Sequence, residues 1–189
     1  MAQNENIERV ATWLKELGVN VTIGTFESRV KIQKFAYLFQ ELFGEKLYKD
    51  TKFHTKGPYS KTLEIDYYSH PDVFSSDVKI ALNQDESREI IRLKSEGFDS
   101  VSALDLEIMA SLEFLKVHEN YDDHDAITKL QERKPYLKLQ DIISGQNKLK
   151  DFMLTESKRK ELLKILEKEM LPFEDASMTD LKDSLKAAE

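Results

Sequence analysis

The strongest structural signal in the sequence is residues 28–43, which read SRVKIQKFAYLFQELF. The large apolar side chains of this stretch recur three or four positions apart, which is the period of one face of an α-helix. They are Ile32, Phe35, Ala36, Phe39, Leu42 and Phe43. The spacing predicts a helix over Ser28–Phe43 that packs on a core, with Ser28 as its N-cap and Gly44 as its stop.

The second signal follows at residues 54–61, which read HTKGPYSK. A glycine and a proline in succession predict a turn, in which Gly57 supplies unusual backbone angles. Pro58 is expected to start a helix that runs from about Tyr59 to Ser69, and Ser60 is a candidate cap for it. Weak alternation of apolar residues on either side predicts short strands at Leu47–Phe53 and Val78–Leu82.

Helical periods continue on both sides of these two signals. Further helices are expected at Ile7–Leu17, Ser87–Lys94, Ser102–Val117, Asp123–Glu132, Leu139–Leu149 and Ser157–Met170. Only 6 glycines and 4 prolines interrupt the chain, which favours helices. The sequence therefore predicts a mostly α protein, a helical bundle with a small two- or three-stranded β element. One domain is expected over residues 1–171, followed by a polar tail at residues 172–189.

The composition excludes several classes of function. The 189 residues contain no cysteine, which rules out disulfides, thiolate metal sites and cysteine nucleophiles. The formal charge of −7 argues against a protein that is basic throughout and coats nucleic acid. No apolar run approaches the roughly 20 residues that span a bilayer, and the N-terminus lacks the pattern of a signal peptide. We therefore expect a cytoplasmic protein without membrane contact.

The charge is distributed unevenly along the chain. Residues 29–61 contain eight basic and three acidic residues, which gives this segment a charge of +5 on an otherwise acidic protein. Tyrosine and phenylalanine residues are interspersed among the lysines. One interpretation is a face that binds an anionic partner, and the other is an ordinary solvated surface whose lysines point in different directions.

No motif for catalysis or metal binding is evident. His118 and His124 have acidic residues between them, but six positions along a helix place two rings on different faces. The segment between them is better explained as a loop in which Asp122 or Asp123 caps the next helix. A phosphate-binding P-loop and a nucleophile elbow are both missing. The sequence therefore predicts a protein that is not an enzyme, with no catalytic residues, no metal and no cofactor.

Two motifs resemble a known family. Lys31-Ile-Gln33-Lys34-Phe-Ala-Tyr37-Leu38, followed by Gly57-Pro58-Tyr59-Ser60, is similar to the paired motifs of the YwgA-like family of small prokaryotic proteins. Leu106–Leu115 and Lys134-Pro135 resemble that family's C-terminal half, although Ile32 replaces its usual leucine. A more distant resemblance is to the Panacea antitoxin domain. The resemblance implies a winged-helix-like N-terminal unit and a regulatory or toxin–antitoxin context.

These observations together yield a set of candidate site residues. The residues expected to contact a partner or an anion are Lys31, Lys34, Lys56, Lys61 and Tyr59. The residues expected to set the local fold are Gln33, Tyr37, Gly57, Pro58 and Ser60, and Gln33 is predicted to hydrogen-bond the turn at Gly57. Lys31 and Lys34 are placed on an exposed strip beside the apolar face.

The expected function is a non-catalytic regulatory or antitoxin-like module that binds a partner protein, for example a toxin or a nuclease. A winged-helix DNA-binding regulator is the alternative, in which the helix at residues 59–69 would enter the major groove. A homodimer is also left open by the sequence.

Overall fold

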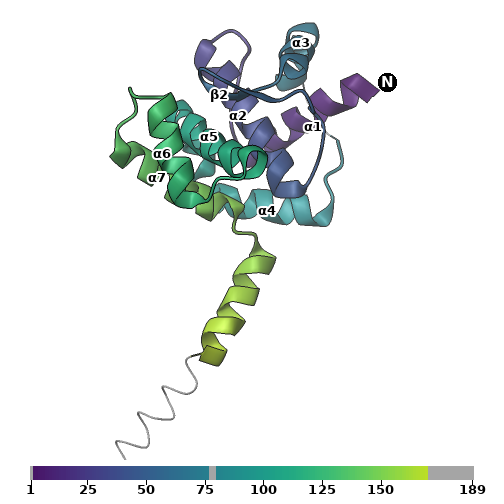
Figure 1. The fold of residues 1–189 in the computed structure, drawn as a ribbon. Helices are drawn as coiled ribbons and strands as arrows, with labels where there is room; N and C mark the ends of the chain where they lie inside the picture. The colour runs from purple at the N-terminus through teal and green to yellow at the C-terminus, as the bar shows by residue number, and fades with distance from the viewer. Residues whose placement is uncertain (1, 77–79, 170–189) are drawn as a thin grey trace, which may run out of the picture. The chain divides into compact units, whose positions relative to one another are not determined.

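A computed structural model describes residues 2–76 and 80–169, with side chains described from residue 5 onward. The chain is mostly helical and contains a two-stranded antiparallel sheet (Figure 1). The elements are α1 (Ala2–Leu17), α2 (Phe26–Phe43), β1 (Lys52–His54), β2 (Gly57–Tyr59), α3 (Lys61–Ser69), η1 (Pro71–Phe74), α4 (Gln84–Ser95), η2 (Phe98–Ser100), α5 (Ala103–Glu119), α6 (Asp123–Arg133) and α7 (Leu139–Met153). A further helix covers residues 156–169.

The chain divides into two compact units. The first unit ends at Met153, and the second begins at Leu154 and includes the helix at residues 156–169. The length of the chain predicts a single domain over residues 1–171. The polar tail expected at residues 172–189 lies outside the described residues.

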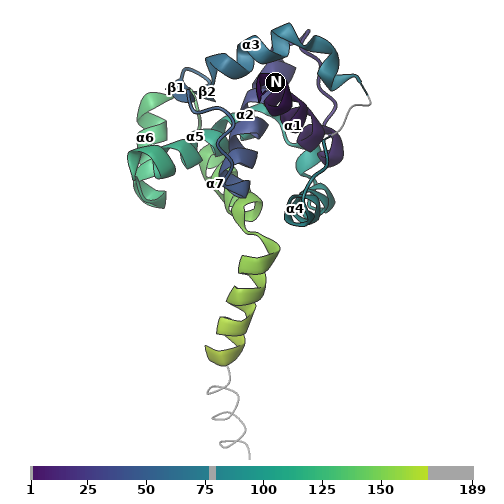
Figure 2. The same ribbon diagram turned by 90° about the vertical axis from the view of Figure 1, so that its right-hand side faces the viewer.

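Helices α2 and α5 form the centre of the first unit. Both are buried over long stretches, α2 from Ile32 to Gln40 and α5 from Leu106 to Leu115. Helices α6 and α7 pack on α5 on the side away from α1, and α3 and the β-hairpin lie on the side opposite α4 (Figures 1 and 2). The helix predicted over Ser28–Phe43 is confirmed, and Gly44 ends it with a left-handed φ of 68°. The predicted cap is wrong: Thr25 caps α2 by accepting a hydrogen bond from the Ser28 N–H.

The segment around the glycine–proline step differs from the prediction. Gly57 and Pro58 form strand β2 rather than a turn that opens a helix, and Gly57 pairs with His54 across the hairpin. Helix α3 starts at Lys61, and Ser60 caps it as predicted by accepting from the Leu63 N–H. Of the strand expected at Leu47–Phe53, only its end forms part of β1. Residues 80–82 are not a strand, and residues 78 and 79 lie outside the described part.

Helix α4 is attached to α1 through a buried carboxylate. Glu86 is 1% exposed, and its Oε1 accepts hydrogen bonds of 2.9 Å from both the Trp13 indole and the Arg9 guanidinium. Its Oε2 accepts from the Asn83 N–H, while the Asn83 side chain accepts from the Glu86 N–H, which makes a capping box. One side chain therefore both caps α4 and binds it to the N-terminal helix.

None of the helices among the described residues combines the length and the apolar character that a membrane span requires.

Candidate functional site

A groove of about 350 Å³ lies between the start of α2, the β-hairpin and α3. Its basic side chains are Arg29, Lys34 and Lys56, and Glu64 is an acidic side chain in its lining. Aromatic rings complete much of the wall, and these are Phe26, His54, Tyr59, Tyr67 and Tyr68. We call this the cationic groove. Aromatic and basic side chains in a concave surface are typical of binding sites for partners and ligands.

The structure brings together several of the residues selected from sequence. Lys34, Lys56 and Tyr59 line the cationic groove, as do Gln33 and Gly57. The Lys61 ammonium lies at its edge and pairs with the carboxylate of Glu64. Four other selected residues do not line the groove: Pro58 and Ser60 are buried within and just after β2, and the remaining two lie on α2. Lys31 is paired with Glu27 at 3.4 Å outside the groove lining, and Tyr37 lines a different cavity.

Lys34 is buried, which corrects the prediction that it lies on an exposed strip. Its side chain is 2% exposed, and its Nζ donates a hydrogen bond to the carbonyl oxygen of Pro58. The neighbouring Gln33 holds the same segment in place, but through Ser60 rather than Gly57. Its amide donates to the Ser60 carbonyl at 3.0 Å and accepts from the Ser60 N–H at 2.9 Å. Consecutive polar residues of α2 therefore fix the end of β2.

A buried carboxylate, that of Glu107, lies behind the groove and pairs with two lysines. The Oε1 of Glu107 is 2.6 Å from the Lys134 Nζ, and its Oε2 is 3.4 Å from the Lys56 Nζ. The Tyr136 hydroxyl also donates to Glu107 Oε1, at 2.6 Å. Lys34 experiences the charges of Glu107, Lys56 and Lys134. The cluster of these four charged residues therefore has one negative charge for three potential positive charges.

The pKa values in this cluster follow from burial and from the shared carboxylate. Burial, reinforced by the charge of Lys134, lowers the pKa of Lys34 to about 7. Burial also lowers the pKa of Lys134, although its hydrogen bond to Glu107 opposes that shift. For Glu107, burial would raise the pKa, but the hydrogen bonds from Lys134 and Tyr136 lower it overall.

The low pKa of Lys34 predicts a pH dependence of stability. Between about pH 7 and the ordinary lysine value of 10.5, the unfolded chain binds a proton that folded Lys34 does not. Raising the pH in this range therefore favours the folded state. From about pH 7 to about pH 9 we expect a gain of about 2 kcal/mol in the free energy of unfolding. Urea denaturation at these pH values should show the gain in the natural chain and little of it in Lys34→Met, whereas equal gains in both chains would contradict the assignment.

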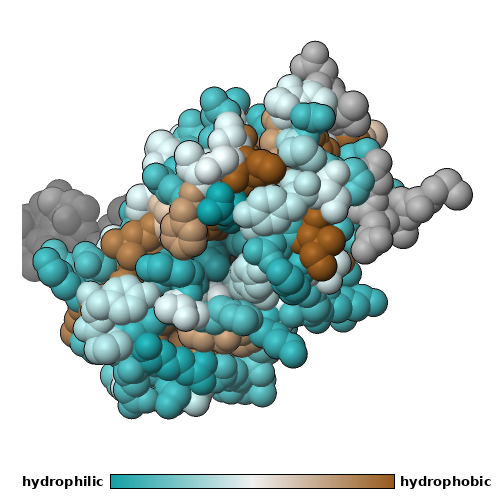
Figure 3. All heavy atoms as spheres, turned by 90° about the horizontal axis from the view of Figure 1, so that it is seen from above, coloured by the Kyte–Doolittle hydropathy of each residue, from teal (hydrophilic) through white to brown (hydrophobic). Residues whose placement is uncertain are grey.

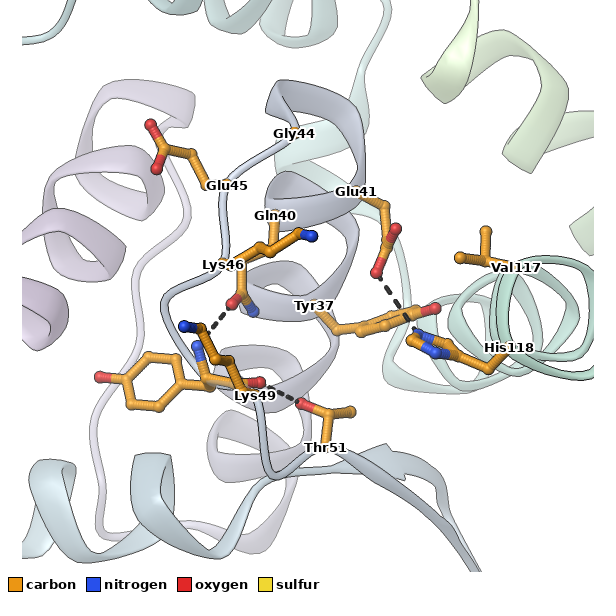
Figure 4. Close-up of a pocket in the computed structure, with 11 residues that line it drawn as sticks. Tyr37, Gln40, Glu41, Gly44, Glu45, Lys46, Lys49, Thr51, Val117 and His118 are labelled. Atoms are coloured by element: carbon orange, nitrogen blue, oxygen red, sulfur yellow. Dashed lines mark hydrogen bonds and ion pairs between the residues drawn. The ribbon is translucent and has the colours of Figure 1, made fainter.

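A second cavity, of about 360 Å³, lies between the C-terminal half of α2, the loop after it and the end of α5 (Figure 4). The Tyr37 ring extends from α2 toward α5, and the Glu41 carboxylate is 3.6 Å from His118 Nε2. Burial, together with the charges of Glu41 and Glu113, raises the pKa of Tyr37. Glu41 and Glu45 line the cavity together with Lys46 and Lys49, so its charges are mixed and favour neither sign of ligand.

The described residues contain no group of three or more metal-binding side chains. His118 pairs with Glu41, and Asp122 caps α6, which is one of the two caps considered from sequence. Sequence reasoning missed Arg29 as a groove residue and missed the cluster around Glu107. No local pattern marks this cluster, because Glu107 and Lys134 lie 27 positions apart in the sequence.

Comparison with known proteins adds no relative. No family model matches the chain, and no curated protein or solved structure is significantly similar to it. The resemblance to the YwgA-like family therefore stays a prediction from the two motifs, and the functional argument depends on the site itself.

Proposed function

We propose that the protein is a non-catalytic, antitoxin-like regulatory module that binds a partner protein through the cationic groove. The observation that carries the proposal is the exposure of large aromatic side chains at a basic concave surface. Phe26 is 61% exposed and Tyr68 is 52% exposed, and both line the groove. Aromatic residues and arginine are enriched at protein interfaces, where a few such residues supply most of the binding energy.

The surroundings of the groove support the same proposal. Seen from the side on which α3 and the hairpin lie, apolar groups interrupt a largely hydrophilic surface (Figure 3). Ile65 of α3 adds a further exposed apolar side chain, with 52% of its surface accessible. The motif resemblance supports the regulatory, antitoxin-like part of the proposal, and these exposed residues support the docking surface.

The double variant Phe26→Ala/Tyr68→Ala tests the docking surface. We expect it to weaken capture of the natural partner by about 30-fold or more, because truncating central interface aromatics costs about 2 kcal/mol or more. The measurement is affinity capture from the host with the full chain, followed by size-exclusion chromatography of the purified complex. Leu104→Ala/Ile143→Ala is the matched control, since both residues are 45% exposed and lie outside the groove. Equal capture by both double variants would contradict the proposal.

DNA binding by a winged-helix-like unit is the second candidate function. Exposed Lys52, His54 and Lys56 on the hairpin beside α3 favour it, since a wing of this kind contacts phosphates. Binding should then weaken steeply with salt, and Lys56→Ala/Lys61→Ala should flatten that dependence. Against this candidate, Lys61 of α3 is already paired with Glu64. The candidate is wrong if no DNA binding is detectable at about 50 mM salt, or if the affinity for DNA does not change with salt concentration.

A further inference from the structure

We infer that the cationic groove binds an acidic side chain of the partner, an Asp or Glu that lies next to an aromatic or other apolar residue. The inference rests on the proposed function and adds the chemistry that the partner must present. It is argued from the charges of the groove, from the buried cluster behind it and from its exposed rings.

The first argument is the charge of the groove lining. Three basic groups line it, Arg29 and Lys34 from α2 and Lys56 from the hairpin. Glu64 is occupied by other groups, because the Lys61 ammonium and the Tyr59 hydroxyl both hydrogen-bond it and lower its pKa. The excess of basic groups over this acid favours a ligand with a negative charge.

The second argument is the shortage of negative charge behind the groove. Glu107 is the carboxylate that Lys56 and Lys134 share, and it is also the acid whose charge acts on Lys34. The hydrogen-bond acceptor of Lys34 is the Pro58 carbonyl, which has no net charge. Burying a cation without a full counter-charge is costly, so a carboxylate in the groove would offset a cost that the free protein bears. Lys56 is the group placed to contact it directly, since 46% of its side chain is exposed.

The third argument distinguishes a peptide from a nucleic acid. Phe26 and Tyr68 are apolar surfaces beside the basic groups, and they suit a side chain that flanks the acid. A volume of about 350 Å³ is in the range of pockets that hold a few side chains. Nucleic-acid binding relies on neutralising many phosphates, whereas only three basic groups line this groove. Their number suits one carboxylate better than a phosphate backbone.

The test uses peptides selected by the purified full chain from a random phage-displayed library. The tightest peptide is synthesised with its acidic residue and with the corresponding amide, and both forms are titrated by isothermal calorimetry. For the natural chain we expect the amide form to bind at least about tenfold more weakly. For Lys34→Met/Lys56→Gln we expect the two forms to bind within about threefold of each other. Lys52→Gln is the control, because this lysine is exposed on the same hairpin but does not line the groove.

The opposite outcomes separate the inference from the proposed function. If the amide peptide binds as tightly as the acid and binding still requires Phe26 and Tyr68, the acid requirement is wrong while the docking surface stands. If selected peptides bind Phe26→Ala/Tyr68→Ala as well as they bind the natural chain, the groove is not the docking surface and both fail. A selection that returns no binding peptide overturns the inference, whereas the proposed function is then judged by capture of the full-length partner. Circular dichroism of each variant verifies that it is folded.

Discussion

Replacing Gly57 with alanine is expected to lower the free energy of unfolding by about 3 to 4 kcal/mol, through backbone strain and overpacking. Gly57 has a φ of +82°, which side chains other than glycine rarely adopt. A Cβ atom there would lie 2.4 Å from the Ser111 Oγ and 3.4 Å from the Glu107 carbonyl oxygen. The hairpin lies so close to α5 at this point that the added carbon has no space. Urea denaturation followed by circular dichroism measures the change.

Gly97 provides a matched control for this prediction. It has the same φ of +82°, but nothing lies within 4 Å of the position of its Cβ. Gly97→Ala should therefore cost only the backbone strain, about 1 to 2 kcal/mol. Adding Ser111→Ala to Gly57→Ala removes the clashing oxygen and should restore about 1 to 2 kcal/mol, the part due to overpacking. Equal losses in the two glycine variants would show that the contact between the hairpin and α5 is not tight.

Replacing Glu107 with glutamine is expected to be about as damaging, with a loss of about 3 to 5 kcal/mol. The side chain keeps its shape and some of its hydrogen bonds, but the cluster loses its negative charge. Lys34 and Lys134 are each 2% exposed and would remain buried without a counter-charge. Part of the loss is relieved when Lys34 gives up a proton, so the destabilisation should be larger at about pH 6 than at about pH 9.

A second substitution distinguishes charge from packing at Glu107. Adding Lys134→Met to Glu107→Gln removes one of the unpaired cations and should recover a large part of the lost stability, because an apolar side chain replaces a buried ion well. Glu27→Gln is the control for the loss of an ion pair as such. Glu27 is 67% exposed and pairs with Lys31, so its loss should cost less than about 1 kcal/mol. If Lys134→Met makes the glutamine variant still less stable, the cluster is held together by packing rather than by charge.

Much of the helical framework could be predicted from local patterns. The apolar period located α2 and α5. Short-range chemistry identified Gly44 and Ser60 as helix ends and narrowed the cap of α6 to Asp122 or Asp123, of which Asp122 is the cap. The start of α2 was missed by two residues because both Thr25 and Ser28 can cap a helix, and only the backbone geometry chooses between them. The hairpin was misplaced because three-residue strands carry too few residues to establish an alternating pattern.

The candidate site was only partly accessible to sequence reasoning, for a physical reason. Lys34 lies three positions after the half-buried, polar Lys31 on α2, so its spacing alone suggests a surface lysine. Its burial depends on the Pro58 carbonyl, 24 positions away, and on the charge of Glu107, which comes from α5. Such long-range partners leave no periodic signal in a single sequence. Five of the selected residues line the cationic groove, and the contacts that each of them makes followed only from the three-dimensional structure.

Because the Glu86 carboxylate accepts a hydrogen bond from Trp13, the contact between α4 and α1 can be followed by tryptophan fluorescence. Trp13 is the single tryptophan of the chain, its side chain is 0% exposed, and its indole N–H donates to this carboxylate. Separating α4 from α1 would remove that acceptor and admit water to the ring. The emission maximum of Trp13 should then move to longer wavelength. The fluorescence of the unlabelled protein therefore reports whether α1 and α4 remain in contact, without interference from another indole.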